Sequence, residues 1–439
     1  CAAERVRRGE AGGAANLLVR LFYDGAGALD AAREVPSHFD AAAADDAGLD
    51  EQIAIALEEA MSQTSFKPNV SQQEAVRWAL KRRIGMIRGP PGTGKTRCSA
   101  LFISTVLKMR IKRRRVSDGE EEEDTKSPRI LAVTHSNGAA DVLLQALLQL
   151  NVPAVRAGRP ASVSESVQHR TIAALSERMP EVVRLRQQAC DVTLDSQTRS
   201  SAAYDAKQYQ SDVQNMIAKS APVVVASCIG AQQLLSSSGE NEDDESAFPI
   251  VVLDEASQST EPALVCALAA AKAEQVILVG DTQQLPPTVT TQDVELRESI
   301  GVSPMERLLK NGIDEFVLKE QYRMPQSLLQ HPNKHFYDGI VECATTGGID
   351  PNLPPPTGFP WPSPNNEPLA FIEIGSDSEL SHNFGGKSNP IEAGVIIDIV
   401  GNVVAAGDVS AEKIAIITPY SKQVQLLRTE LSYSRHSSG

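Results

Sequence analysis

The stretch Gly89-Pro90-Pro91-Gly92-Thr93-Gly94-Lys95-Thr96 decides the fold of this chain, because it has the spacing G-x-x-x-x-G-K-[ST]. Glycines let the backbone turn tightly around phosphate oxygens and accept positive φ where required. A helix after the loop offers free N–H groups and a favourable dipole to negative charge. We therefore expect Lys95 to reach the terminal phosphates of a nucleotide and the Thr96 hydroxyl to ligate Mg²⁺. A glycine-rich turn that matches by chance is the alternative.

The sequence on either side of this stretch has the pattern that such a loop needs. A short apolar run at 84–87 suits a buried strand, and apolar residues recur at helical spacing over 98–106. Similar apolar runs alternate with helical patterns as far as residue 295, at 130–134, 223–226, 250–253 and 276–279. Runs that are apolar throughout are typical of a parallel sheet covered by helices on both faces, which predicts an α/β fold.

Length and composition limit the possible classes. The 439 residues are enough for more than one domain, each with its own core. A net charge of −14 argues against a protein that is basic all over, but allows a local basic channel. The six cysteines form no C-x-x-C pair and no zinc spacing with the histidines, which favours an intracellular, reducing compartment. No apolar stretch is long enough to span a membrane. The chain begins at Cys1, so we expect a fragment.

The sequence predicts three segments. Residues 1–65 form an N-terminal helical or irregular segment, 66–298 a first nucleotide-binding domain, and 299–439 a second α/β domain. Strand candidates in the second domain are 316–318, 369–374 and 414–418.

Two insertions interrupt the first domain. Residues 108–128 run from basic to acidic, which predicts a solvated, disordered loop. Its basic part, 108–115, is compatible with a nuclear-import signal or a nucleic-acid contact, and slightly favours the nucleus over the cytoplasm. A charge-balanced surface loop explains it equally well. Residues 162–220 are polar and helical, and we expect them to protrude, where they could dock recruiting proteins.

Acidic and amide residues follow two of the predicted strands. Asp254 and Glu255 end the run at 250–253, where the first acid can hold Mg²⁺ and the second can orient water and accept its proton. Solvated acids that cap a strand are the alternative, which the phosphate loop makes weaker. Gln284 follows the run at 276–279, where an amide can reach the γ-phosphate, although a surface glutamine in a turn fits as well.

Three further residues are candidates for nucleotide contact. Gln72 precedes the loop by about one helix, where an amide can pair with both edges of adenine. Tyr322 could stack on adenine, and Arg323 could neutralise charge on the transferring phosphate. A core tyrosine and a surface arginine are the simpler explanation from these residues alone.

As an ordered set, these blocks resemble the superfamily 1 helicases, and most closely the nonsense-mediated-decay and senataxin-type branch. The resemblance covers roughly 66–425 and rests on 89–96, 254–258 with 261–262, 280–287, 321–324 with 336–339, and 417–420 with Gln423. Further matches are Thr134-His135-Ser136-Asn137 with Asp141, the run 227–231, the Trp361 loop, and Asn389 with Glu392-Ala393.

The resemblance implies a fold, two ligands and a set of site residues. The fold is a pair of RecA-like parallel-sheet domains (a P-loop NTPase fold), with ATP and Mg²⁺ in the cleft and a single strand of RNA or DNA across both. Adenine contacts would be Gln72 and Tyr322, while Gln284 and Arg323 would sense the γ-phosphate. The loop Gly89–Thr96 would hold the phosphates, with Lys95, Asp254 and Glu255 in catalytic roles. Nucleic-acid contacts would be Thr134, Ser136, Asn137, Cys228, Gly230, Thr418, Pro419 and Tyr420.

The sequence departs from the family at two places. Pro325-Gln326 stand where the family has His-Pro, and the last two motifs of the family, including its second phosphate-sensing arginine, are not found. We therefore expect an ATP-dependent RNA or DNA helicase or translocase whose second domain is incomplete. The alternatives are a non-catalytic regulator that binds ATP or nucleic acid, and a nucleic-acid-bound scaffold that docks partners through its helical insertion.

Overall fold

The computed structural model describes residues 13–23, 28–36, 46–62, 67–109, 113–117, 120–124, 128–236, 248–344, 354–362, 369–375, 380–381 and 386–436. The chain divides into two compact units. The first takes Cys1–Arg323 with His335–Gly347, and the second takes Met324–Lys334 with Gly348–Gly439. Every residue that the sequence proposes as an ATP contact belongs to the first unit.

The first unit is built on a seven-stranded sheet. Its strands are β1 (Ile84–Arg88), β4 (Ile130–Thr134), β5 (Ala154–Arg156), β6 (Val223–Ser227), β7 (Ile250–Asp254), β8 (Gln275–Gly280) and β9 (Glu315–Val317). All pairs are parallel, in the order β5-β6-β4-β7-β8-β1-β9. The α/β prediction and the five strands expected before residue 295 are confirmed. Because the strands are parallel, the loops that leave their carboxyl ends emerge at one edge of the sheet.

Helices cover both faces of this sheet. One face carries α4 (Asp46–Ser62), α5 (Val70–Leu80), α6 (Lys95–Lys108) and α7 (Asn137–Gln149). The other carries α2 (Gly13–Tyr23), α3 (Leu29–Arg33), α12 (Cys228–Ser236), α13 (Glu261–Ala271) and α15 (Pro304–Lys310). Met86 packs into one core and Ile87 into the other, which explains why the strands are apolar throughout. Within the described ranges, no helix combines the length and apolar character that a membrane crossing needs.

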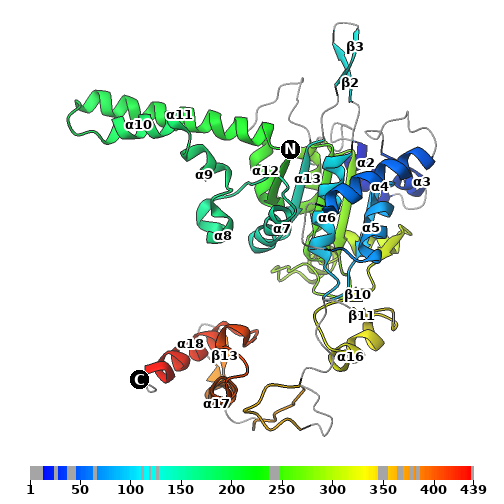
Figure 1. The fold of residues 1–439 in the computed structure, drawn as a ribbon, viewed down its shortest axis with the longest axis vertical. Helices are drawn as coiled ribbons and strands as arrows, with labels where there is room; N and C mark the ends of the chain where they lie inside the picture. The colour runs from blue at the N-terminus through cyan, green and yellow to red at the C-terminus, as the bar shows by residue number, and fades with distance from the viewer. Residues whose placement is uncertain are drawn as a thin grey trace. The chain divides into compact units, whose positions relative to one another are not determined.

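A group of helices between β5 and β6 forms the insertion expected at 162–220. It contains α8 (Glu165–Gln168), α9 (Ile172–Glu177), α10 (Pro180–Cys190) and α11 (Ser196–Ser220), preceded by the 3₁₀ turn η2 (Pro160–Ser162). Helices α10 and α11 lie side by side and extend away from the sheet (Figure 1). The Asp195 carboxylate accepts hydrogen bonds from the amides of Gln197 and Thr198 and so caps α11.

The charged insertion differs from the disordered loop that its composition predicted. Two strands, β2 (Arg113–Ser117) and β3 (Glu120–Asp124), form an antiparallel hairpin. Its register pairs Arg113 with Asp124, Arg114 with Glu123 and Arg115 with Glu122. Composition alone carries no information about such a register. The other residues of 110–127 lie outside the described part.

The strand predicted at 316–318 belongs to the first sheet and does not open a second one. β9 pairs with β1, and the Arg88 guanidinium lies 2.9 Å from the Glu315 carboxylate across that pair. The first unit accordingly continues to Arg323, beyond the boundary predicted at 299. An apolar run specifies a strand but not its neighbour, and so the sequence pattern misassigned it. Beyond β9, β10 (Glu320–Gln321) pairs with β11 (Glu342–Cys343).

The second unit is mostly helical where it is described. Its elements are α17 (Pro390–Ala406), the 3₁₀ turn η5 (Ala411–Lys413), α18 (Ser421–His436) and a short pair, β12 (Leu380–Ser381) with β13 (Lys387–Ser388). The strands predicted at 369–374 and 414–418 are wrong, since both segments are described without strand structure. The Gln423 side chain of α18 hydrogen-bonds to the backbone N–H and C=O of Asn389, which caps α17.

Candidate nucleotide and nucleic-acid sites

The phosphate loop joins β1 to α6, and its backbone has the conformation that phosphate binding requires. Gly92 and Gly94 both have φ of 80°, in the left-handed region that favours glycine. A Cβ at Gly89 would lie 2.3 Å from Cγ of Lys95, so no larger residue fits there. No side chain caps the start of α6, which leaves its first N–H groups available to an anion.

Lys95 is buried at the first position of α6, with oxygens on two sides of its ammonium group. Its Nζ donates to the Gly89 carbonyl at 3.0 Å and lies 4.0 Å from Oε1 of Glu255. The Thr93 hydroxyl donates to the Pro90 carbonyl at 2.7 Å and fixes the turn of the loop. The loop and its lysine therefore present a preformed positive site to a phosphate group.

Asp254 lies at the carboxyl end of β7 and is 1% exposed. Its carboxylate accepts hydrogen bonds from the hydroxyls of Ser99, at 3.1 Å, and Thr96. Burial raises the pKa of Asp254 to about 6, although both hydrogen bonds and the charge of Lys95 oppose the rise.

The same pair of oxygens suits the expected Mg²⁺. A carboxylate and a hydroxyl are hard ligands of the kind Mg²⁺ prefers, and phosphates and waters complete its shell. A buried carboxylate whose pKa is raised would also gain from a nearby cation. The structure describes no cluster of three or more acidic, histidine or cysteine side chains elsewhere that could hold a metal. Thr96 and Asp254 therefore fit the ion.

Glu255 follows Asp254 with an unusual backbone. Its φ of 55° lies in the left-handed region, which costs on the order of 1 kcal/mol for a non-glycine residue. Gln258, in the 3₁₀ turn η3 (Ala256–Gln258), donates from Nε2 to Glu255 Oε2 at 3.1 Å. The turn thus fixes a carboxylate 4.0 Å from Lys95, where it can act on a water beside the phosphates.

Gln284 lies after β8 within a polar network. Its Nε2 donates to Oδ2 of Asp281 at 2.6 Å, and the hydroxyl of Tyr337 donates to the same oxygen at 2.8 Å. Burial, followed by the charge of Asp281, raises the pKa of Tyr337, so the phenol remains a donor. Asp281 therefore fixes the side chain of Gln284, which is the predicted γ-phosphate sensor.

The structure gives Gln72 a role that differs from direct adenine contact. Its side chain is 2% exposed and donates from Nε2 to the Thr93 carbonyl at 2.9 Å. Its Oε1 accepts from the amide of Asn69, which completes a capping box at the start of α5. Both ends of the amide are therefore used by the protein, and Gln72 braces the phosphate loop.

Tyr322 and Arg323 lie against this loop. The Tyr322 amide donates to the Gly92 carbonyl at 3.0 Å, and a Cβ at Gly92 would lie 2.7 Å from the Cβ of Arg323. The Tyr322 hydroxyl accepts from the Asn69 side chain at 2.9 Å. Arg323 is exposed. The first unit thus brings both residues to the phosphate loop, as their predicted roles require.

The predicted nucleic-acid residues of the first unit follow the strands beside β7. The register pairs Thr134 of β4 with Asp254 on one side and with Ser227 of β6 on the other. Thr134 itself is buried, and its hydroxyl donates to the Ser136 carbonyl at 2.7 Å. Ser136 and Asn137 are exposed at the start of α7. Direct side-chain contact is therefore open to Ser136 and Asn137 but not to Thr134.

The loop after β6 gives a similar result. Cys228 is 4% exposed and burial raises the pKa of its thiol to about 11, so it is an unreactive packing residue. The amide of Gly230 donates to Ser227 Oγ at 3.2 Å. A Cβ at Gly230 would lie 3.1 Å from the same oxygen. Gly230 is half-buried with its N–H engaged, and Ile229 beside it is 67% exposed.

The remaining predicted contacts belong to the second unit. Pro419 and Tyr420 are exposed, and Thr418 is half-buried, in the turn before α18. The Thr418 hydroxyl accepts from the amide of Tyr420 at 3.3 Å, which closes the turn.

Comparisons with known proteins identify the family. Two family models, both described as AAA domain, match this chain, one over 67–203 and 181–292 and the other over 300–438. The first alone spans more than half of the chain. The chain belongs to the superfamily 1 helicases, in the nonsense-mediated-decay and senataxin-type branch.

Individual relatives agree with this assignment to the superfamily 1 branch. The chain is 31% identical over 383 residues to the Regulator of nonsense transcripts 1 homolog of Drosophila melanogaster, covering 84% of this chain and 29% of that protein. It is 31% identical over 368 residues to the ATP-dependent helicase upf1 of Schizosaccharomyces pombe, covering 81% and 36%. This superfamily 1 chain therefore spans about a third of the length of the curated relatives it matches.

A solved structure of an Arterivirus nonstructural protein 10 (helicase) with DNA is 12% identical, with a TM-score of 0.33, and covers 65% of this chain and 43% of that one. A similarity of this size supports no conclusion.

Three residues of this superfamily 1 site were not among the predicted site residues. Ser99 and Gln258 hold the two acids, and Tyr337 holds the aspartate beside Gln284. Ser99 lies four positions after Lys95, on the same face of α6, so helical spacing could have identified it. The other two contacts join segments whose proximity no sequence pattern specifies.

Proposed function

We propose that this protein hydrolyses ATP, with Mg²⁺, and couples hydrolysis to movement along single-stranded RNA or DNA. The observation that carries the proposal is the sheet edge of the first unit. The phosphate loop, the acids and Gln284 follow β1, β7 and β8, while the exposed Ser136–Asn137 turn follows the adjacent β4. One edge of one sheet thus offers both a nucleotide site and a polar, exposed site beside it.

Each nucleotide-site residue has a proposed task. Lys95 and the loop amides bind the phosphates, and bound Mg²⁺ would supply positive charge at Thr96 and Asp254. Glu255, oriented by Gln258, takes the proton of the attacking water. Gln284 and Arg323 respond to the γ-phosphate, and Tyr322 packs against the base. The closeness of Tyr322 and Arg323 to Gly92 supports this arrangement.

The nucleic-acid contacts are proposed to be sequence-independent. Ser136, Asn137 and Gly230 offer hydrogen-bonding groups without a set of base-reading side chains, so backbone contact is favoured. We further propose that the exposed face of α10 and α11 is available to recruiting proteins, since few of the described residues of α11 are buried.

The test is ATPase activity with and without homopolymer RNA and DNA, together with strand displacement. We expect strand-stimulated hydrolysis and binding that weakens as salt rises. Fluorescence anisotropy on oligonucleotides of mixed and uniform sequence measures the binding. Tight nucleotide binding without any turnover would instead favour the non-catalytic regulator, because the acid pair would then lack its proposed use. A strong preference for one sequence with little salt dependence would contradict backbone contact.

A further inference from the structure

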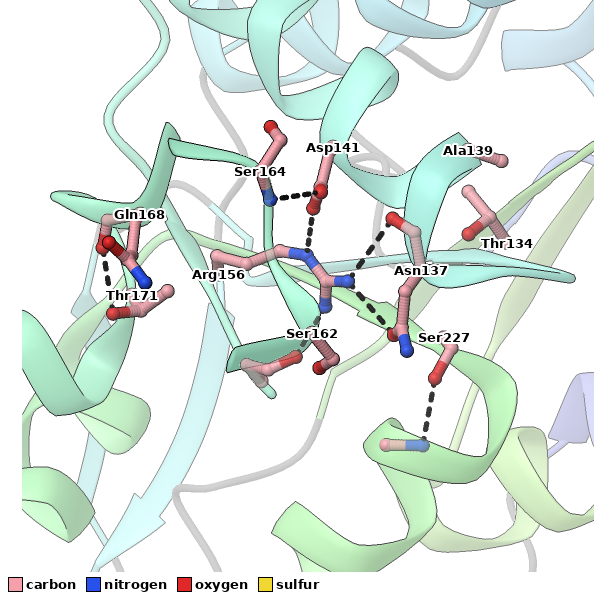
Figure 2. Close-up of polar contacts among 12 residues, drawn as sticks. Thr134, Asn137, Ala139, Asp141, Arg156, Ser162, Ser164, Gln168, Thr171 and Ser227 are labelled. Carbon is pink, nitrogen blue, oxygen red and sulfur yellow. Dashed lines mark hydrogen bonds and ion pairs between the residues drawn. The ribbon is translucent and has the colours of Figure 1, made fainter. Parts of the chain in front are cut away.

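The largest completely buried side chain in the described residues is a charged one. Arg156, at the end of β5, is 0% exposed. Its Nε donates to Oδ1 of Asp141 on α7 at 3.0 Å, and the second Asp141 oxygen accepts from the amide of Ser164 at 2.8 Å (Figure 2). A buried ion pair loses much of its attraction to desolvation, and apolar residues of similar volume often stabilise a fold as well. Core stability alone therefore gives a weak reason for this arginine.

The other end of the guanidinium reaches the exposed turn after β4. Nη1 donates to the Ala157 carbonyl at 2.5 Å. Nη2 donates twice to Asn137, to its side-chain Oδ1 at 3.1 Å and to its backbone carbonyl at 3.4 Å. Asp141 thus fixes the position of Arg156, and Arg156 fixes the first residue of α7, as Figure 2 shows.

This contact decides which way the amide of Asn137 faces. A guanidinium has only donors, so the oxygen of the amide must face Arg156 and the nitrogen must face away. Asn137 is exposed, and no other hydrogen bond of its side chain is described. The N–H₂ group is therefore presented outward, next to the capping Ser136. The exposed end of the side chain therefore presents its two N–H donors, while its oxygen faces Arg156.

We propose that Arg156 is a positioning residue that makes Asn137 a dedicated donor to the oxygens of a nucleic-acid backbone. The ligand groups are phosphate or sugar oxygens of a single strand, which accept hydrogen bonds. Arg156 stays buried and touches no ligand, since its effect passes through Asn137. The inference rests on the proposed nucleic-acid site and specifies the chemistry of one of its contacts.

The experiment compares substitutions at Asn137 in the whole chain, with fluorescein-labelled U15 and dT15 as probes. Asn137→Ala removes the donor, and we expect binding about 5- to 10-fold weaker. Asn137→Asp still accepts from Arg156 but turns an anionic oxygen outward, so we expect a loss of about 30-fold or more. Gln52→Glu, on the exposed face of α4, adds the same charge elsewhere and should leave affinity unchanged. Affinity for Mg²⁺-ATP reports that the fold is intact.

A double-mutant cycle then tests the role of Arg156. Arg156→Lys keeps the charge but loses the two bonds to Asn137. We expect it to weaken probe binding about as much as Asn137→Ala, with no further loss in the double variant. Additive losses, or a loss for Asn137→Asp no larger than for Asn137→Ala, would overturn the inference. The Asn137 variants lie on the surface and decide the matter even if Arg156→Lys does not fold. A wild-type chain that binds neither probe would refute the proposed function instead.

Discussion

The hydroxyl of Ser99 donates a hydrogen bond of 3.1 Å to Oδ1 of Asp254. The contact joins the helix that follows the phosphate loop to the strand that carries the two acids. Because Ser99 lies one turn after Lys95, it also sets the distance between the lysine and the acids. The carboxylate is nevertheless buried at a cost, since burial raises its pKa to about 6.

We expect Asp254→Asn to stabilise the nucleotide-free protein at neutral pH. A carboxyl group whose pKa is higher in the folded state than its ordinary 3.8 favours folding when protonated. That contribution is fully present below about pH 4 and is lost as pH rises through about 6. A pKa difference of about 2 corresponds to about 3 kcal/mol. Thermal unfolding across this range should show the wild type losing stability relative to the variant.

The control for that prediction is Asp191→Asn, on the surface. Hydrogen bonds from Thr193 lower the pKa of Asp191, which is the opposite direction. This variant should gain no stability as pH rises. A gap between Asp254→Asn and wild type that is the same at pH 4 and pH 8 would contradict the raised pKa.

Lys95→Ala should weaken Mg²⁺-ATP binding by about 100-fold or more, because it removes the charge that faces the phosphates. Titration calorimetry measures the loss. The matched variant Lys207→Ala, on the exposed side of α11, should bind ATP like the wild type. Equal affinity in Lys95→Ala and wild type would refute the assignment of the loop.

Glu255→Gln should leave ATP binding intact and lower turnover by about 100-fold or more, since the amide cannot accept the proton of the attacking water. Gln258→Ala removes only the bond that orients Glu255, so a loss of about 10-fold is expected. The double variant should be no slower than Glu255→Gln. Steady-state ATPase rates decide this, and an unchanged rate for Glu255→Gln would mean that another group acts as the base.

Tyr337→Phe should destabilise the first unit by about 1.5–3 kcal/mol, because it removes a buried donor to the charged Asp281. Urea unfolding measures the change, with the exposed Tyr204→Phe as its control. Equal unfolding midpoints for both variants and the wild type would show that the hydrogen bond contributes nothing.

The fold of the first unit could be predicted where burial alone determines structure. β4, β6 and β7 are apolar and buried on both faces, and each was predicted within one residue. β5 was missed because it has only three residues and ends in Arg156. β9 was assigned to the wrong sheet because its pairing with β1 and the Arg88–Glu315 ion pair are long-range contacts, which no local pattern records.

The site residues could likewise be predicted where local sequence fixes their position, but not where contacts between distant segments do. The proximity of Lys95, Thr96, Asp254 and Glu255 could be predicted, because a phosphate loop and the ends of parallel strands bring such residues together. The contacts of Gln72 with Asn69 and Thr93 could not be predicted, because no sequence pattern records them. Contacts of this kind decide whether the donors and acceptors of a polar side chain remain available to a ligand.

The pairing of Thr134 with Asp254 limits how the first unit can move. Neighbouring strands lie about 4.8 Å apart, and their hydrogen bonds tolerate shifts of only a few tenths of an ångström. The acid strand cannot slide without carrying the Ser136–Asn137 turn with it. We therefore expect the proposed nucleotide site and the Ser136–Asn137 turn to move together, because they follow adjacent strands of one sheet.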